Sequence, residues 1–282
     1  MSWRLDVKHT TGYRYSREVV ASYNEARLTP QSTAEQVTIG ARVDVDPPAR
    51  LYRYWDYWGT LVHAFDLHVP HVELVVTASS TVETGAAPAI ADATAMAWSD
   101  LDESGVVDAF YEYLVPSRAV VADDALRAVA AGLRAVETPA AAVIDVMGWV
   151  DDQLVYEQGR TTVSTSALEA WRTGRGVCQD FVHLSVALLR SMGVPARYAS
   201  GYLHPDPDAD VGTSVVGQSH AWAEAWLGDW RAFDPTNGAP VADRHVLVGR
   251  GRDYHDVAPL KGIYTGAPAA TPTVTVELTR QA

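Results

Sequence analysis

The only cysteine of the 282-residue chain, Cys178, lies between a glycine-rich turn and a helical pattern. Gly174 and Gly176 precede it, and apolar residues then recur at three- and four-residue steps as far as Met192, just before Gly193. This spacing predicts one helix that begins at the cysteine. A thiol in the first turn of a helix lies near unpaired backbone N–H groups and the positive end of the helix dipole, and both favour the thiolate. Cys178 is therefore our candidate nucleophile.

A cysteine nucleophile needs a base, and the base needs a group that orients it. His220 begins a strand-like segment, and Asp234, 14 residues later, ends the next one. The short turn at residues 227–229 predicts a hairpin, which would bring the histidine close to the aspartate. A carboxylate that accepts from one imidazole nitrogen fixes the tautomer and stabilises the imidazolium. We expect Cys178 to be the nucleophile, His220 the base and Asp234 the orienting group.

Three other polar residues near these positions are expected to be structural. The charge of Asp180 would oppose a thiolate two residues away, so we expect its carboxylate to accept from first-turn N–H groups. His183 lies five residues beyond Cys178, about 140° around the helix, and is read as a core or surface histidine. Glu224 shares a strand face with His220 and is expected to tether a neighbouring loop.

Neither a metal ion nor an organic cofactor is expected. His63 and His68 fall on opposite faces of a predicted strand, and no carboxylate or cysteine pattern completes a site around them. Asp206, Asp208 and Asp210 alternate, but the segment lacks the glycine and the closing glutamate of a calcium loop.

Composition narrows the possible partners and the location. The 22 basic and 35 acidic residues give a net charge of −13, which argues against non-specific binding to nucleic acid or to acidic membranes. A single cysteine excludes an intrachain disulfide. The first eight residues carry charges where a signal peptide would be apolar, and no apolar run is long enough for a membrane helix. We therefore expect a soluble, cytoplasmic protein.

The periodicity predicts an α+β fold with two domains. Residues 1–84 alternate like the strands of an antiparallel sandwich, and residues 85–103 read as a linker. Residues 104–266 are expected to form a core of helices packed on an antiparallel sheet. Its predicted helices are 105–114, 122–136, 140–154, 166–172 and the cysteine helix; its predicted strands are 196–203, 220–227 and 230–233, with a loop at 205–217. Residues 267–282 predict one further strand, and the sequence does not decide which sheet it joins.

Four segments in this order resemble the bacterial transglutaminase-like superfamily, whose members have a papain-like core. They are Gly174-x-Gly-Val-Cys178-Gln-Asp-Phe, Gly193-Val-Pro-Ala-Arg-Tyr-x-Ser-Gly-Tyr202, His220-Ala-Trp-x-Glu224 and Phe233-Asp-Pro-Thr-Asn237; Arg244-His245 and Gly251-Arg-Asp-Tyr254 continue the likeness. The first domain, with His9-Thr-Thr-Gly-Tyr13 and Asp56-Tyr-Trp-Gly59, is similar to the β-rich N-terminal domain often fused to that core.

This resemblance implies a Cys178–His220–Asp234 triad that acts on a carboxamide. The backbone N–H of Cys178 is the default donor to the oxyanion, and Tyr156, upstream in the chain, is a second candidate. We expect an enzyme that cleaves peptide or side-chain amide bonds through a thioester, with a peptide or protein as its substrate. Two alternatives stay open, a protein-glutamine transamidase and a catalytically idle module that binds peptides or a partner protein. The sequence leaves the substrate, the oligomeric state and the role of the first domain undecided.

Overall fold

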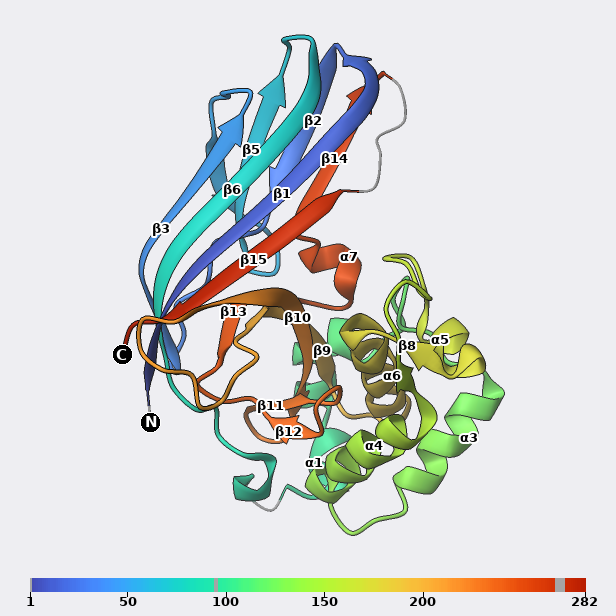
Figure 1. The fold of residues 1–282 in the computed structure, drawn as a ribbon. Helices are drawn as coiled ribbons and strands as arrows, with labels where there is room; N and C mark the ends of the chain where they lie inside the picture. The colour runs from blue at the N-terminus through green and yellow to red at the C-terminus, as the bar shows by residue number, and fades with distance from the viewer. Residues whose placement is uncertain (1, 94–95, 267–271) are drawn as a thin grey trace.

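The computed structural model describes residues 2–93, 96–266 and 272–282, and places a tall, narrow β-sandwich on a broader body of helices and strands (Figure 1). Within the described residues, a nine-stranded sheet runs through both parts in the order β12-β11-β10-β15-β1-β6-β3, with β9 paired to β10 and β13 paired to β9. Its strands are β1 (Trp3–Val19), β3 (Gln36–Asp46), β6 (His71–Thr84), β9 (Ala196–Leu203), β10 (Ser214–Trp226), β11 (Trp230–Asp234), β12 (Ala239–Pro240), β13 (His245–Gly251) and β15 (Thr273–Arg280).

A four-stranded sheet in the order β14-β2-β5-β4 forms the other face of the sandwich. Alternating side chains of the two sheets meet in a core that includes Tyr15, Val19, Phe65 and Leu74. This arrangement confirms the antiparallel, sandwich-like first domain. The strands of this second sheet are β2 (Ala21–Ala26), β4 (Tyr52–Trp55), β5 (Leu61–Leu67) and β14 (Leu260–Thr265).

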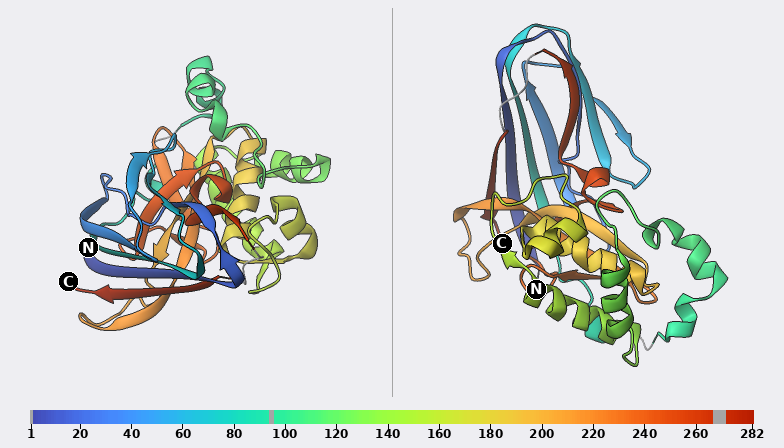
Figure 2. Two further views of the ribbon diagram at one scale, coloured as in Figure 1. Left: turned by 90° about the horizontal axis from the view of Figure 1, so that it is seen from above. Right: turned by 90° about the vertical axis from the view of Figure 1, so that its right-hand side faces the viewer.

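The lower body packs its helices around α6 (Cys178–Ser191), which lies against β9 and β10 (Figures 1 and 2). Every α6 side chain from Gln179 to Arg190 is buried, so the helix forms the centre of the core rather than an amphipathic surface. The α+β prediction is confirmed. The other helical segments are η1 (Ile90–Asp92), α1 (Trp98–Leu101), α2 (Ser104–Ala109), η2 (Tyr111–Tyr113), α3 (Asp124–Leu133), α4 (Pro139–Gln153), α5 (Ala167–Thr173) and α7 (Tyr254–Val257).

Helix starts follow the local sequence. The Thr138 side chain accepts from the N–H of Ala141 at 3.2 Å, with Pro139 at the first helical position of α4. At α5, Ser166 and Glu169 form a reciprocal capping box. No helix in the described ranges combines the length and the apolar character required to cross a bilayer.

The chain returns to the first domain after the core. The predicted domain boundaries assigned residues 260–265 to the core. They form β14, which pairs with β2 and therefore belongs to the four-stranded sheet of the sandwich. β15 pairs with β1 on one side and, over residues 276–279, with β10 on the other, so the last strand joins both parts. Residues 267–271 of the predicted C-terminal segment lie outside the described part.

Two local predictions were wrong. The predicted loop at 205–217 ends earlier, because Ser214 to Gly217 pair with β15 and extend β10. The predicted helix 105–114 is broken into α2 and η2 at Phe110, whose backbone leaves the helical region at φ −118°. The partner of residues 214–217 is more than 55 residues away in the chain, and local patterns do not report such pairings.

Candidate active site

Cys178 is the first residue of α6, as predicted, and its side chain is half-buried. Gly174 ends α5 in the left-handed conformation, with φ at 67°, so the chain turns sharply into the short strand β8 (Arg175–Gly176). β8 pairs in parallel with β7 (Val155–Tyr156), which sets Tyr156 opposite Gly176. The cysteine therefore follows a turn that is held by the end of α5 on one side and by the pairing of β8 with β7 on the other.

Asp180 holds this turn in place. Its Oδ2 accepts from the N–H of Val177 at 2.8 Å and from the Thr161 hydroxyl at 2.6 Å, which confirms the expected bond to a donor at the helix start. The carboxylate occupies the space beside Gly176, where an added Cβ would come within 2.6 Å of Asp180. Glycine at 176 is thus required by close approach of the carboxylate.

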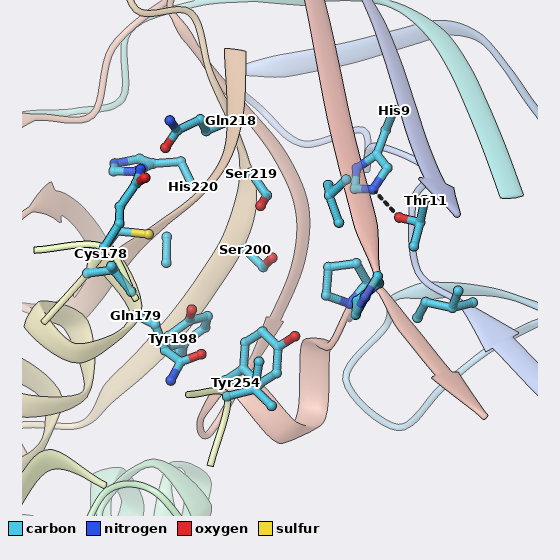
Figure 3. Close-up of a pocket in the computed structure, with 18 of the residues that line it drawn as sticks. His9, Thr11, Cys178, Gln179, Tyr198, Ser200, Gln218, Ser219, His220 and Tyr254 are labelled. Atoms are coloured by element: carbon cyan, nitrogen blue, oxygen red, sulfur yellow. Dashed lines mark hydrogen bonds between the residues drawn. The ribbon is translucent and has the colours of Figure 1, made fainter. Parts of the chain in front are cut away.

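The hairpin of β10 and β11 brings His220 to Asp234. Trp226 pairs with Trp230 beside the turn, and the register places the ends of the strands at the same end of the hairpin. Nε2 of His220 lies 2.7 Å from Oδ2 of Asp234. Because Nε2 is engaged by the carboxylate, Nδ1 is the nitrogen available to the thiol of Cys178, whose sulfur lies beside the ring (Figure 3).

The electrostatics favour a protonated imidazole in this cluster. Burial alone would lower the pKa of His220, but hydrogen bonds and charge interactions with Asp234 and Cys178 outweigh it and raise the pKa from 6.5 to about 9. Burial alone would raise the pKa of Asp234, yet hydrogen bonds led by that from His220 hold it well below its ordinary value. The protonated ring is the form that can give a proton to a leaving group.

Asp234 is held by more donors than the sequence indicates. The N–H of Thr236 donates to Oδ1 at 3.0 Å and the Asn237 amide donates to Oδ2 at 2.6 Å. His245, buried on β13, brings Nε2 to 3.4 Å from Oδ2 of Asp234. Its Nδ1 accepts from the N–H of Ala242 at 3.2 Å, so the proton of the neutral ring is on Nε2 and points to the carboxylate.

His245 belongs to a motif found in the sequence, but the sequence did not predict a role for it. Its position opposite β9 depends on sheet pairing that no local spacing predicts. The ring packs edge-on against Trp222, at 5.4 Å between centroids.

His220, Asp234 and His245 also form the one group in the described residues with the donor atoms for a metal ion, all within 4.8 Å of one another. A metal ion there would displace the Nε2 proton and break the hydrogen bond between His220 and Asp234. The metal-binding and acid–base roles of this cluster therefore exclude each other.

A pocket of about 370 Å³ opens at Cys178 and His220. Tyr156, the second oxyanion-donor candidate, lines it, as do Tyr198 and Tyr254. The opposite wall comes from the first domain, where His9, Thr11 and Tyr13 of β1 and Val274 of β15 line the same pocket (Figure 3). Sequence patterns left the role of this domain undecided, because its approach to the cysteine depends on the pairing of β15 with β1 and β10.

The other two residues expected to be structural, His183 and Glu224, have partners outside the triad. His183 is fully buried and accepts from the N–H of Tyr254 at 3.2 Å, and burial lowers its pKa to about 3. Glu224 is buried between Arg197 and Arg250, with hydrogen bonds of 2.6 and 2.9 Å. It therefore tethers β10 to β9 and β13.

Comparison with known proteins gives the family. The sequence model of the Transglutaminase-like superfamily matches residues 127–235, and that of the Bacterial transglutaminase-like N-terminal region matches residues 5–83. The chain belongs to the transglutaminase-like superfamily. It is similar to an uncharacterized protein of Mycobacterium leprae, at 48% identity over 99% of this chain and 100% of the relative. An uncharacterized protein of Mycobacterium tuberculosis is 33% identical over 98% of this chain and 92% of the relative.

A solved structure shares the whole architecture of this transglutaminase-like protein. The crystal structure of a putative cysteine protease from Cytophaga hutchinsonii superposes with a TM-score of 0.79 at 22% identity, and covers 100% of this chain and 98% of that one. The two-part fold is thus shared over its full length.

Proposed function

We propose that this protein is a cysteine peptidase or amidase that cleaves peptide or side-chain amide bonds through a thioester. The observation that carries the proposal is the Cys178 thiol at the start of α6, beside a histidine whose other nitrogen is 2.7 Å from a buried carboxylate, at the base of a pocket. This arrangement supplies a nucleophile, a proton donor and an orienting group in contact with one another.

The proposed reaction has two steps. Sγ of Cys178 forms a bond to the carbonyl carbon, and the C–N bond breaks as His220 transfers its Nδ1 proton to the leaving amine. A water molecule then attacks the thioester, His220 takes its proton, and Sγ leaves as thiolate. Cys178 and Tyr156 both line the pocket, and the N–H of Cys178 and the hydroxyl of Tyr156 are the proposed donors to the oxyanion.

Alkylation of the single cysteine tests the nucleophile. Iodoacetamide is expected to label Cys178 stoichiometrically at neutral pH, faster than it labels a free thiol, and His220→Ala is expected to abolish the acceleration. Labelling no faster than that of a free thiol, unchanged in His220→Ala, would contradict the ion pair.

A peptide library, incubated with and without a primary amine, tests the reaction. We expect new carboxyl termini or deamidated side chains with the wild type and none with Cys178→Ala. Incorporation of the amine without hydrolysis would replace the hydrolase proposal with a transamidase. Rapid labelling with no turnover of any peptide would favour the binding module.

A further inference from the structure

The wall that the first domain adds to the pocket at Cys178 is mainly apolar. Five of the described residues on this wall are apolar or aromatic: Tyr13 of β1, Pro259, Leu260 of β14, Pro272 and Val274 of β15. Val274 pairs with Thr11 across the ladder of β1 and β15, so both side chains lie on the face that borders the pocket. Leu260 also packs against the buried core of the sandwich, so apolar surface continues from that core to the cavity.

The polar side chains of this wall pair with each other. Nε2 of His9 lies 2.8 Å from the hydroxyl oxygen of Thr11, and both residues are almost fully buried (Figure 3). Burial lowers the pKa of His9 to about 4, so its ring is neutral at pH 7. The wall therefore presents mainly carbon atoms, and no charge, to a molecule that enters the pocket.

Part of the apolar surface in this pocket is open to solvent. Val274 is 50% exposed, and Val163, which lines the pocket from the core, is 57% exposed. Exposed apolar surface within a concave pocket is typical of a binding groove. No lysine, arginine, aspartate or glutamate is found among the described residues that line the pocket, so a charged side chain would meet no opposite charge there.

We infer that the first domain supplies a subsite for one large apolar side chain of the peptide, aliphatic or aromatic, close to the bond that Cys178 attacks. The inference rests on the proposed function, and concerns a residue that the substrate carries beside the reacting group. The apolar wall and the thiol line one cavity of about 370 Å³, so a single peptide can contact both. A leucine or phenylalanine there would remove its own apolar surface and that of Val274 from water, whereas a lysine or glutamate would lose its hydration without compensation.

Binding to Cys178→Ala measures this preference without turnover. The probes are acetylated heptapeptide amides of glycine and serine in which one residue, moved along the peptide, is Phe, Leu, Ser, Lys or Glu. We expect calorimetry to give, at one position, a Kd for the Phe or Leu peptide that is at least about tenfold lower than for the Ser, Lys or Glu peptide. This factor is the low end of the gain from burying a large apolar side chain.

Val274→Asp tests the wall itself. In the same background it is expected to remove most of the apolar preference. The Lys peptide should then bind at least about threefold more tightly than the Glu peptide, because the introduced carboxylate attracts an ammonium group and repels a carboxylate. An unfolded variant would not produce this gain. Val72→Asp is the matched control, because Val72 is 53% exposed on β6 and does not line the pocket, so the order of affinities should be kept.

Each result bears on the inference. Equal affinity for the Leu and Ser peptides at every position, an unchanged order of affinities in Val274→Asp, or no measurable binding of any peptide would overturn it. Wild-type turnover, measured in parallel, separates this result from the proposed reaction. Turnover without an apolar preference refutes the inference alone, and a Val274-dependent apolar preference without turnover refutes the proposed reaction alone.

Discussion

Asp234→Asn removes the charge that keeps His220 protonated while it leaves an oxygen for the Thr236 and Asn237 N–H groups. Without that charge, only the interactions with Cys178 oppose burial, so the pKa of His220 should fall from about 9 towards its ordinary value of 6.5. At pH 7.5 a fall of the pKa from about 9 to 6.5 would lower the imidazolium fraction from about 97% to about 9%. The rate of alkylation of Cys178 by iodoacetamide at that pH is expected to fall about tenfold or more.

The same change alters the stability profile. The pKa of His220 is raised on folding, so its favourable contribution is complete below pH 6.5 and is lost as the pH rises through about 9. A rise from 6.5 to about 9 corresponds to about 3 kcal/mol, since one pKa unit is about 1.4 kcal/mol. In urea titrations the wild type should lose about that much free energy of unfolding between pH 6.5 and 9.5 relative to Asp234→Asn.

Asp229→Asn is the matched control, because Asp229 lies in the turn of the same hairpin and pairs with Arg231 at 2.6 Å, away from the cysteine. It should keep the wild-type alkylation profile. A folded Asp234→Asn variant that alkylates at the wild-type rate across pH 6–9 would refute the assignment of Asp234 as the group that sets the charge of His220.

Two further variants address single contacts. Tyr156→Phe removes one proposed oxyanion donor, so kcat of peptide hydrolysis should fall about tenfold to a hundredfold. The rate of iodoacetamide labelling should stay unchanged. Slower labelling with an unchanged kcat would contradict this role. His245→Phe removes one donor to Asp234 and leaves the Ala242 N–H without its acceptor. The free energy of unfolding in urea should therefore fall by about 1–3 kcal/mol, while labelling of Cys178 slows less than tenfold. A stability equal to that of the wild type would show that the contact contributes nothing.

The parts of the site that the sequence predicted are those set by local structure. Cys178 follows from a helical period and a preceding turn, and the proximity of His220 and Asp234 follows from a hairpin with a short turn. His245 and Thr11 reach the site through strands that pair across more than 40 residues or across the whole chain. Tertiary packing decides which strands pair, and the hydrophobic periodicity of a single strand does not identify its partner.

The bridging position of β15 also sets the order in which the two sides of the pocket can form during synthesis. The nucleophile, the base and the carboxylate all leave the ribosome before residue 240, and the helical core around α6 has its own buried cluster by then. The first strands of the upper sandwich emerge earliest, but the sandwich also needs β14, which pairs with β2, and β15, which pairs with β1. The wall that faces the cysteine therefore forms after the catalytic residues have emerged, so a nascent chain that still lacks β14 and β15 exposes its thiol more openly.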